Sequence, residues 1–201
     1  MDRDTGDKVV ARAISCLLDG GVILLPTDTV YGLAVHPMHD DAAARLFAMK
    51  RRPRTRNLPI MVSSVDDLDD LAVEINEAAR HLMETFFPGP LTVALGLREA
   101  SAPHWLAGRT EVAIRVPDDK ELRTILETTG PLLVTSANVH AQATPESVES
   151  ILATLDGEPD LVIDGGVRPV IPSTLVNCNL PTPVIERAGA LSEAEIERAL
   201  R

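Results

Sequence analysis

Apolar residues recur along this chain at two spacings, one typical of helices and the other typical of buried strands. Over residues 9–18 they fall three to four positions apart, which predicts an amphipathic helix that ends at Gly20-Gly21. The run Val22–Leu25 that follows is wholly apolar, as in a strand covered on both faces. A second helix is predicted over about 41–51, because Pro53 prevents its continuation.

The remaining pattern predicts helices and strands that alternate early in the chain, whereas strands follow strands near its end. Further helices are expected over 75–86, 119–129 and 147–155 and after the capping box Ser192–Glu195. Further strands are expected over 58–62, 91–97, 112–116, 132–135, 161–163, 174–177 and 184–186. This order favours an α/β fold, a single domain in which helices flank a twisted mixed sheet.

Composition and cysteine content favour a cytoplasmic protein that does not enter a membrane. Hydrophobic residues make up 45% of the 201 residues and aromatic residues only 2%, so aliphatic side chains fill the core. No apolar run reaches the length of a membrane span, and the charged N-terminus lacks a signal-peptide core. Cys16 and Cys178 stand far apart and outside any CxxC spacing, which indicates a reducing compartment and no structural metal.

Positive charge is concentrated at one point of an acidic chain. The formal net charge is −11, yet five of the 19 lysines and arginines lie in the stretch Lys50–Arg56, which holds no acid. Outside this stretch, 14 basic and 30 acidic residues leave a charge of −16. Concentrated charge raises the local potential, which indicates a site for a compact polyanion. The alternative is a solvated helix end that suits the helix dipole, and the acidic remainder disfavours a protein that coats nucleic acid.

Hydroxyl-rich turns adjoin three of the predicted strands. They are Pro26–Leu33 after the first strand, Thr135–Asn138 at the end of another, and Pro172–Thr174 before a third. Ligands of open α/β sheets bind at strand ends, where Ser, Thr and Asn side chains bond phosphate, ribose or an amino acid. Small polar residues also dominate ordinary turns, so each turn alone has a purely structural explanation. Together with the cationic stretch, the three turns predict one shared pocket.

Arg115 lies in an apolar predicted strand and Arg187 directly after the end of another, and no familiar catalytic motif accompanies them. Arg115 and Arg187 either face solvent at an edge or reach a carboxylate or phosphate. The chain has no Walker A loop, no GxGxxG and no G-x-S-x-G elbow, and its five histidines are scattered, which disfavours zinc. An enzyme with this sequence is expected to work by positioning and electrostatics rather than by a protein nucleophile.

Eight short motifs follow one another along the chain. They are Pro26–Leu33, Lys50-x-Arg52-Pro53, Phe87–Thr92, Val112–Pro117, Ser136–Asn138, Asp164–Gly166, Pro172–Thr174 and Arg187–Gly189. Their order resembles that of YrdC-like domains. Each motif alone is weak, whereas eight in order are highly specific. The chain resembles the short, single-domain L-threonylcarbamoyladenylate synthases of this family, and the resemblance implies one YrdC-like domain over residues 8–200.

The resemblance implies a large concave cavity that binds ATP, L-threonine and bicarbonate or CO2, with Mg2+ carried by the ATP. It implies threonylcarbamoyl-AMP as the product, with pyrophosphate released. It also implies tRNA threonylcarbamoyltransferase proteins as partners that move the threonylcarbamoyl group to a tRNA adenosine, with at most a weak contact between this chain and tRNA. The residues that it implies for L-threonine binding are Thr27, Tyr31, Arg115, Val134 and Ser173. For ATP it implies Lys50, Arg52, Arg54, Ser136, Asn138, Thr144 and Arg187, with Lys50 and Arg52 also catalytic.

Three departures from the family pattern affect loop shape rather than charge. Asn57, His140-Ala141 and Val170-Ile171 stand where the family has a proline, a serine-glycine pair and a nearby glycine. Lys50 and Arg52 are both retained, which favours an active synthase. Two alternatives stay open. One is a YrdC-like enzyme that forms carbamoyl-AMP from carbamoyl phosphate, and the other is an RNA-binding module that uses the Lys50–Arg56 stretch.

Overall fold

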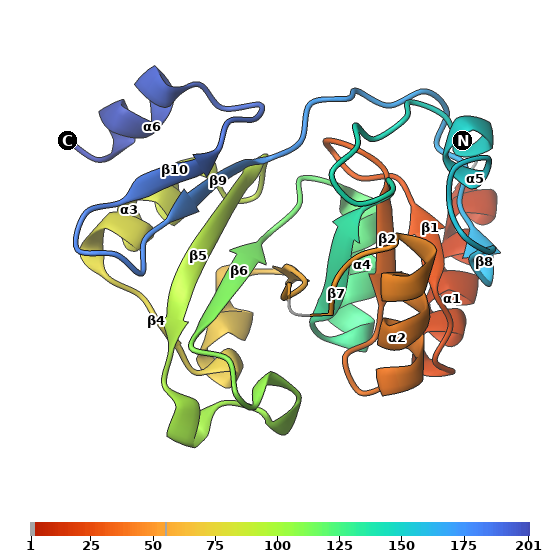
Figure 1. Ribbon diagram of the computed structural model, residues 1–201, viewed down its shortest axis with the longest axis horizontal. Helices are drawn as coiled ribbons and strands as arrows, with labels where there is room; N and C mark the ends of the chain where they lie inside the picture. The colour runs from red at the N-terminus through yellow and green to blue at the C-terminus, as the bar shows by residue number, and fades with distance from the viewer. Residues whose placement is uncertain (1–2, 55) are drawn as a thin grey trace.

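The computed structural model describes residues 3–54 and 56–201 and shows one mixed sheet with helices on both faces (Figure 1). The helices are α1 (Arg3–Leu18), α2 (Asp40–Met49), α3 (Glu77–Phe86), α4 (Lys120–Thr129), α5 (Val148–Leu152) and α6 (Glu193–Ala199), with short 3₁₀ helices at Val65–Leu71, Glu99–Ser101 and His104–Leu106. The strands are β1 (Ile23–Leu25), β2 (Gly32–Val35), β3 (Ile60–Met61), β4 (Val73–Glu74), β5 (Leu91–Leu97), β6 (Glu111–Arg115), β7 (Leu132–Ser136), β8 (Leu161–Val162), β9 (Thr174–Asn177) and β10 (Val184–Arg187). The predicted single-domain α/β fold with a mixed sheet is confirmed.

A two-residue strand joins the two halves of the sheet. The strand order is β10-β9-β5-β6-β3-β7-β2-β1-β8, with β4 paired to β5. Ile60 of β3 pairs with Ile114 of β6 in parallel orientation and with Leu133 of β7 in antiparallel orientation. Figure 1 shows β5, β6, β9 and β10 on one side of the molecule and β1, β2 and β7 on the other. Residues around β3 therefore lie where the two halves meet.

Alternate residues of β1 enter two separate cores. Leu24 belongs to the same core cluster as Leu46 of α2, whereas Ile23 and Leu25 belong to the cluster that includes residues of α1 and α4. Successive side chains of a strand point to opposite faces, so a wholly apolar strand needs cover on both sides. The prediction that this strand is covered on both faces is confirmed. Burying each such aliphatic side chain stabilises the fold by about 1.5–3 kcal/mol.

The helix ends follow local signals in the sequence. Ser192 accepts a hydrogen bond from Glu195 N, and the Glu195 carboxylate accepts one from Ser192 N, so the predicted capping box is confirmed. Asn76 caps α3 and Asp119 caps α4, each by accepting a bond from the backbone N–H three residues on. A cap of this kind contributes about 1 kcal/mol. No helix in the described part of the chain is both long and apolar enough to cross a membrane.

Several elements differ from the pattern-based prediction. Gly32, predicted to belong to a turn, begins β2, which pairs with β1 in antiparallel orientation. The second helix ends at Met49, since Lys50 is its C-cap and Arg51 has a φ of 49°, in the left-handed region where a right-handed helix cannot continue. β3 and α5 are also shorter than predicted. Ile60 and Met61 are the two residues of β3 that pair with both neighbouring strands.

Candidate active site

A cavity of about 230 Å³ lies where the two halves of the sheet meet. Its walls come from the β1–β2 loop, the segment after α2, and strands on both sides of β3: Thr27, Thr29, Val30, Tyr31, Gly32, Arg52, Asn57, Pro59, Met61, Thr92, Ala113, Arg115, Val134, Thr135, Ser136, Pro172, Ser173, Leu175 and Arg187. The walls hold three arginines and no aspartate or glutamate. In a chain of net charge −11, such a cavity is built for anions. A wider groove of about 550 Å³ between α3 and α6 shares no residue with it and has two glutamates in its walls.

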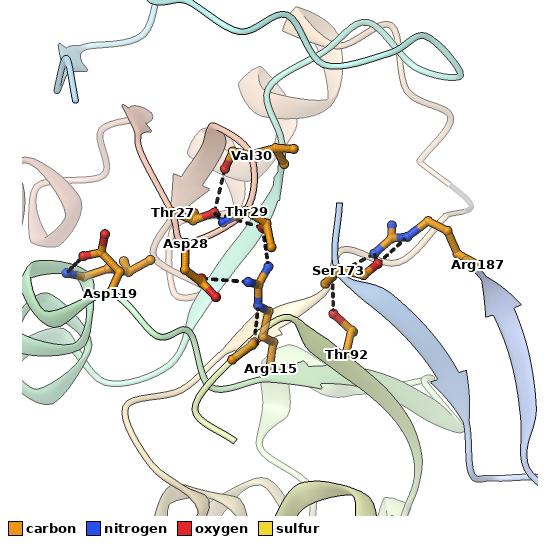
Figure 2. Close-up of polar contacts among 11 residues, drawn as sticks. Thr27, Asp28, Thr29, Val30, Thr92, Arg115, Asp119, Ser173 and Arg187 are labelled. Atoms are coloured by element: carbon orange, nitrogen blue, oxygen red, sulfur yellow. Dashed lines mark hydrogen bonds and ion pairs between the residues drawn. The ribbon is translucent and has the colours of Figure 1, made fainter. Parts of the chain in front are cut away.

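Arg115, at the end of β6, is buried and held by three acceptors. Its Nε donates to Gly89 O at 3.1 Å, its Nη1 to Thr29 Oγ1 at 2.8 Å and its Nη2 to Asp28 Oδ1 at 2.7 Å (Figure 2). Only 4% of Arg115 is exposed. Burial lowers the pKa of Arg115, and the Asp28 carboxylate opposes that shift. The sequence left two alternatives for Arg115, exposure to solvent at a sheet edge or contact with a carboxylate or phosphate. The structure shows contact with a carboxylate.

The β1–β2 loop, residues 26–31, is stabilised by hydrogen bonds between one of its own hydroxyl groups and its backbone. Thr27 Oγ1 donates to Val30 O at 2.6 Å and accepts from Thr29 N at 3.1 Å. Both threonines are buried. Hydroxyl side chains that bond to nearby backbone groups stabilise tight turns. The loop therefore holds Thr27 in the cavity wall and presents Asp28 and Thr29 to Arg115 (Figure 2).

A second arginine reaches the cavity from β10. Arg187 Nη2 donates to Ser173 O at 2.9 Å and to Ser173 Oγ at 3.0 Å, and Arg187 Nε donates to Ser173 O at 3.1 Å. Ser173 Oγ also lies 2.8 Å from Thr92 Oγ1 on β5. Partial burial of the guanidinium, followed by the charge of Arg115, lowers the pKa of Arg187. Two guanidinium groups thus face one cavity, and Arg187 bonds there to neutral oxygens.

Lys50 lies behind the cavity wall rather than in it. It is the C-cap of α2 and only 1% exposed. Its Nζ donates to Asn138 O at 2.6 Å, to Asn138 Oδ1 at 3.3 Å, and to Ser136 O. Burial and, to a smaller extent, the charge of Arg52 lower the pKa of Lys50 to about 7. The predicted nucleotide residues Lys50, Ser136 and Asn138 are therefore in direct contact.

The turn after β7 is organised by the side chain of Asn138. Its Nδ2 donates to Val139 O at 2.8 Å and to Gln142 O at 2.7 Å. Its Oδ1 accepts from Ser136 Oγ and, at 3.3 Å, from Thr144 Oγ1. Thr144 thus joins the same polar group, although it does not line the cavity. A buried amide with its donors and its acceptor engaged rigidifies the turn that it belongs to.

The cationic stretch does not form one continuous patch. Arg52 lines the cavity and donates to Asn57 O at 2.8 Å, and burial followed by the charge of Arg56 lowers its pKa. Arg51 instead makes an exposed bidentate ion pair with Asp156, with both N–O distances 2.6 Å. Arg54 is exposed and does not line the cavity. The side chains separate because the chain leaves α2 through the left-handed conformation of Arg51.

Residues 15–189 of this chain match the model of the Sua5/YciO/YrdC family, which is described as "Telomere recombination". This chain belongs to that family. The crystal structure of P. abyssi Sua5 complexed with L-threonine is similar to it, with a TM-score of 0.85 and 32% sequence identity over 94% of this chain and 56% of that one. The resemblance to YrdC-like domains that the eight motifs indicate is therefore confirmed.

Two curated relatives in the Sua5/YciO/YrdC family are named threonylcarbamoyl-AMP synthase. The protein of Bacillus subtilis (strain 168) is 32% identical over 199 residues, which cover 98% of this chain and 58% of the relative. The protein of Stutzerimonas stutzeri (strain A1501) is 31% identical over 163 residues, which cover 81% of this chain and 88% of the relative. The chain thus spans little more than half the length of the Bacillus relative and of Sua5.

Tyr31, from the first of the eight motifs, lines the cavity while its hydroxyl bonds to residues outside it. The residue is fully buried. Its hydroxyl lies 2.6 Å from Gly166 O and accepts a bond from Gly165 N at 2.9 Å. Burial is the main cause that raises the pKa of Tyr31. Tyr31 therefore connects the cavity to the Asp164–Gly166 motif.

Most of the residues carried over from the family lie together. Eight line the cavity: Thr27, Tyr31, Arg52, Arg115, Val134, Ser136, Ser173 and Arg187. Three more lie behind the cavity wall. Lys50 bonds to Ser136 and Asn138, and Thr144 bonds to Asn138. Arg54 is the one carried-over residue that contacts neither the cavity nor this polar group among the described contacts. The individual roles of these residues remain predictions.

Among the polar residues not carried over from the family, three bond through their side chains to Arg115 or Ser173. Asp28 and Thr29 bond to Arg115, and Thr92 bonds to Ser173. Each lies inside one of the eight motifs, so the sequence did hold a signal for them. Their partners are 81 to 87 residues away along the chain, a separation that no local pattern encodes.

Proposed function

We propose that this chain is an ATP-dependent L-threonylcarbamoyladenylate synthase. The observation that carries the proposal is the cavity with three arginines and no acid in its walls, lined by six threonine and serine residues. Cations hold the carboxylate and phosphates of the substrates, and hydroxyl groups bond amino-acid and ribose oxygens. The names of the curated relatives and of Sua5 with L-threonine support the same activity for this chain.

L-threonine is proposed to bind at the Arg115 end of the cavity. Arg115 offers N–H groups to its carboxylate, and Ser173 lies beside the second guanidinium, Arg187. Thr27 and Val134 form walls of the same cavity, one polar and one apolar, as the hydroxyl and methyl groups of the threonine side chain require.

ATP is proposed to bind between Arg52, Ser136 and Arg187. A cavity of about 230 Å³ is smaller than the roughly 300–1,000 Å³ of typical small-molecule sites. The triphosphate is therefore expected to extend out of the enclosed part, past Arg52 toward the segment that follows it. Lys50 and Asn138 support this end from behind, since both bond to the turn that presents Ser136.

The proposed reaction forms a carbamate and then an anhydride. The amine of threonine attacks CO2, or bicarbonate with loss of hydroxide, and loses a proton to give an N-carboxylate. An oxygen of that carboxylate attacks the α-phosphorus, the bond from this phosphorus to the bridging oxygen breaks, and pyrophosphate leaves with the electron pair. Two anions approach each other in this step, so fixed cations lower its barrier more than they strengthen substrate binding. Lys50 and Arg52 are the residues proposed for this electrostatic role.

Mg2+ is proposed to enter this site with the nucleotide. Within residues 3–54 and 56–201, no group of three or more His, Cys, Asp or Glu side chains is placed to hold a metal. The cavity walls also lack carboxylates. A magnesium ion bound to the phosphates would neutralise charge on the leaving pyrophosphate, and it would need few protein carboxylates.

The cell context of the proposed reaction is the modification of tRNA. The mixed anhydride is an activated acyl donor, and tRNA threonylcarbamoyltransferase proteins are proposed to pass its threonylcarbamoyl group to tRNA in the cytoplasm. RNA binding as the main function is less favoured by the structure, because the Lys50–Arg56 stretch places Lys50 inside the fold and pairs Arg51 with Asp156. Any tRNA contact of this chain is expected to be weak.

The decisive experiment supplies substrates one at a time to the purified chain. Pyrophosphate release and threonylcarbamoyl-AMP, identified by mass spectrometry, are expected only when ATP, L-threonine and bicarbonate are all present. Pyrophosphate release with ATP and carbamoyl phosphate in place of threonine and bicarbonate would establish the carbamoyl-AMP alternative instead. Tight tRNA binding that weakens steeply with salt, in the absence of ATP binding, would establish the RNA-binding module.

A further inference from the structure

We propose that Asp28 is the positioning residue for Arg115, fixing the guanidinium so that its two unused N–H groups receive the carboxylate of the amino-acid substrate. The inference deepens the proposed function and rests on it for the identity of that substrate. Asp28 does not line the cavity, and its side chain is 12% exposed. It acts through Arg115 rather than on the substrate.

Counting donors shows what Asp28 leaves for a ligand. A guanidinium has five N–H donors, one on Nε and two on each Nη. Gly89 O takes the Nε donor, Thr29 Oγ1 takes one from Nη1, and Asp28 Oδ1 takes one from Nη2. One donor remains on each Nη nitrogen. Two donors on adjacent nitrogens form the pair that a carboxylate accepts in a bidentate manner.

The ion pair also joins the two halves of the molecule at the cavity. Asp28 belongs to the loop between β1 and β2, Arg115 ends β6, and the residues are 87 positions apart in the chain. Along the sheet, these two halves are connected through the short strand β3. Figure 2 shows Asp28 and Thr29 meeting the end of the Arg115 side chain from the loop side. The pair therefore fixes the position of Arg115 relative to the loop that carries Thr27.

Electrostatics explains why a carboxylate holds Arg115. Burial disfavours the guanidinium charge, and a buried charge without a partner is costly. The charge of Arg115 also lowers the pKa of Arg187, and both residues line the same cavity. Asp28 balances one of these charges before substrate arrives. Its main contribution to binding is then orientation, since its negative charge by itself repels a substrate carboxylate.

This distinction between orientation and charge can be tested with two substitutions at one position. Asp28→Asn keeps the Oδ1 acceptor for Arg115 Nη2 and removes the charge, whereas Asp28→Ala removes both. Asp156→Ala is the matched control, because it removes an exposed aspartate–arginine pair outside the cavity. Calorimetric titration is expected to show L-threonine binding at least about tenfold weaker for Asp28→Ala, which corresponds to the loss of one contact of ordinary strength. Binding by Asp28→Asn and Asp156→Ala is expected to stay within about threefold of wild type.

ATP binding separates positioning from a general loss of structure. A variant with a disordered cavity would bind ATP and L-threonine less well, whereas Asp28→Ala is expected to keep ATP affinity within about threefold. Equal losses for both ligands in Asp28→Ala, or L-threonine binding by Asp28→Ala at wild-type strength, would overturn the proposal. So would Asp28→Asn binding as weakly as Asp28→Ala, because the charge rather than the orientation would then matter.

A ligand-free measurement distinguishes failure of this inference from failure of the proposed function. Nitrogen-15 spectra of the arginine side chains report whether the guanidinium of Arg115 rotates slowly. Separate Nη signals are expected in wild type and Asp28→Asn, and averaged signals in Asp28→Ala. If wild type shows slow rotation but does not bind L-threonine, Asp28 does orient Arg115, and the proposed identity of the substrate is wrong. Averaged signals in wild type would overturn the orienting contact itself.

Discussion

Lys50 Nζ lies 2.6 Å from Asn138 O and 3.3 Å from Asn138 Oδ1, so a single ammonium ties the end of α2 to the turn after β7. The two residues are 88 positions apart in the chain. The same nitrogen also donates to Ser136 O, and Ser136 lines the cavity. Lys50 can therefore influence the cavity through the turn, in addition to any direct contact that it makes with phosphate once the nucleotide is bound.

Replacement of Lys50 is predicted to slow the reaction. Lys50→Ala should lower pyrophosphate release at least about tenfold, or ~1.4 kcal/mol in the barrier, because its proposed electrostatic effect on the transition state and its support of the turn that presents Ser136 are both lost. Single-turnover assays with saturating ATP and threonine measure this effect. Arg51→Ala is the control, since Arg51 pairs with exposed Asp156 and should leave turnover unchanged. Unchanged turnover in Lys50→Ala would remove Lys50 from the reaction.

Lys50 is also predicted to make stability depend on pH. Its pKa is lowered to about 7 in the folded protein, against roughly 10.4 in an unfolded chain. Between these two values the unfolded state binds more protons, so the contribution of Lys50 to the free energy of unfolding rises with pH. Below about pH 7 the full cost of burying the charge remains.

Chemical denaturation of wild type and Lys50→Met across this range checks the prediction. The stability of wild type relative to the variant should increase from about pH 7 to about pH 10. Comparison with the variant cancels the other titrating groups. Parallel curves for the two proteins would show that Lys50 has the same proton affinity in both states.

Loss of Arg115 is predicted to affect one substrate more than the other. Arg115→Ala should raise the L-threonine concentration needed for half-maximal rate and leave the ATP requirement little changed, because Arg115 lies at the proposed carboxylate end of the cavity. Steady-state titration of each substrate measures the two requirements. The opposite result, with ATP affected and threonine not, would mean that the two ligands bind at exchanged ends.

Gly189 is predicted to be intolerant of a side chain. A Cβ at this position would collide with the backbone of Pro172, Ser173 and Thr174, the turn that holds Arg187. Gly189→Ala should therefore lower the free energy of unfolding by about 2 kcal/mol or more and weaken activity.

Gly108 provides the comparison for that prediction. It has a φ of 76°, and a Cβ there would meet no atom within 4 Å, so Gly108→Ala incurs only backbone strain of about 1 kcal/mol. Chemical denaturation of both variants measures the difference. Equal losses of stability would show that the turn at Ser173 moves aside without cost.

Elements with a long regular pattern were predictable from the sequence. α3, α4 and β5 form close to where apolar spacing placed them, because a helix or strand of this length repeats its pattern over several residues. β2 and the two-residue β3 were harder, since their formation depends on pairing with strands that are distant in the chain. Likewise, the family motifs identified most walls of the cavity but not the partner of any side chain in it.

The sequence by itself determined the α/β class, the family, and the residue types that reach the cavity, because each of these is encoded in local order. Tertiary structure decided how the neighbouring cations are used. Lys50 turns inward to the turn after β7, Arg51 turns outward to Asp156, and Arg52 enters the cavity. It also decided that Asp28 holds Arg115. The physical reason is that a charged side chain takes the partner that folding brings within reach, and the burial of that pair sets its energy.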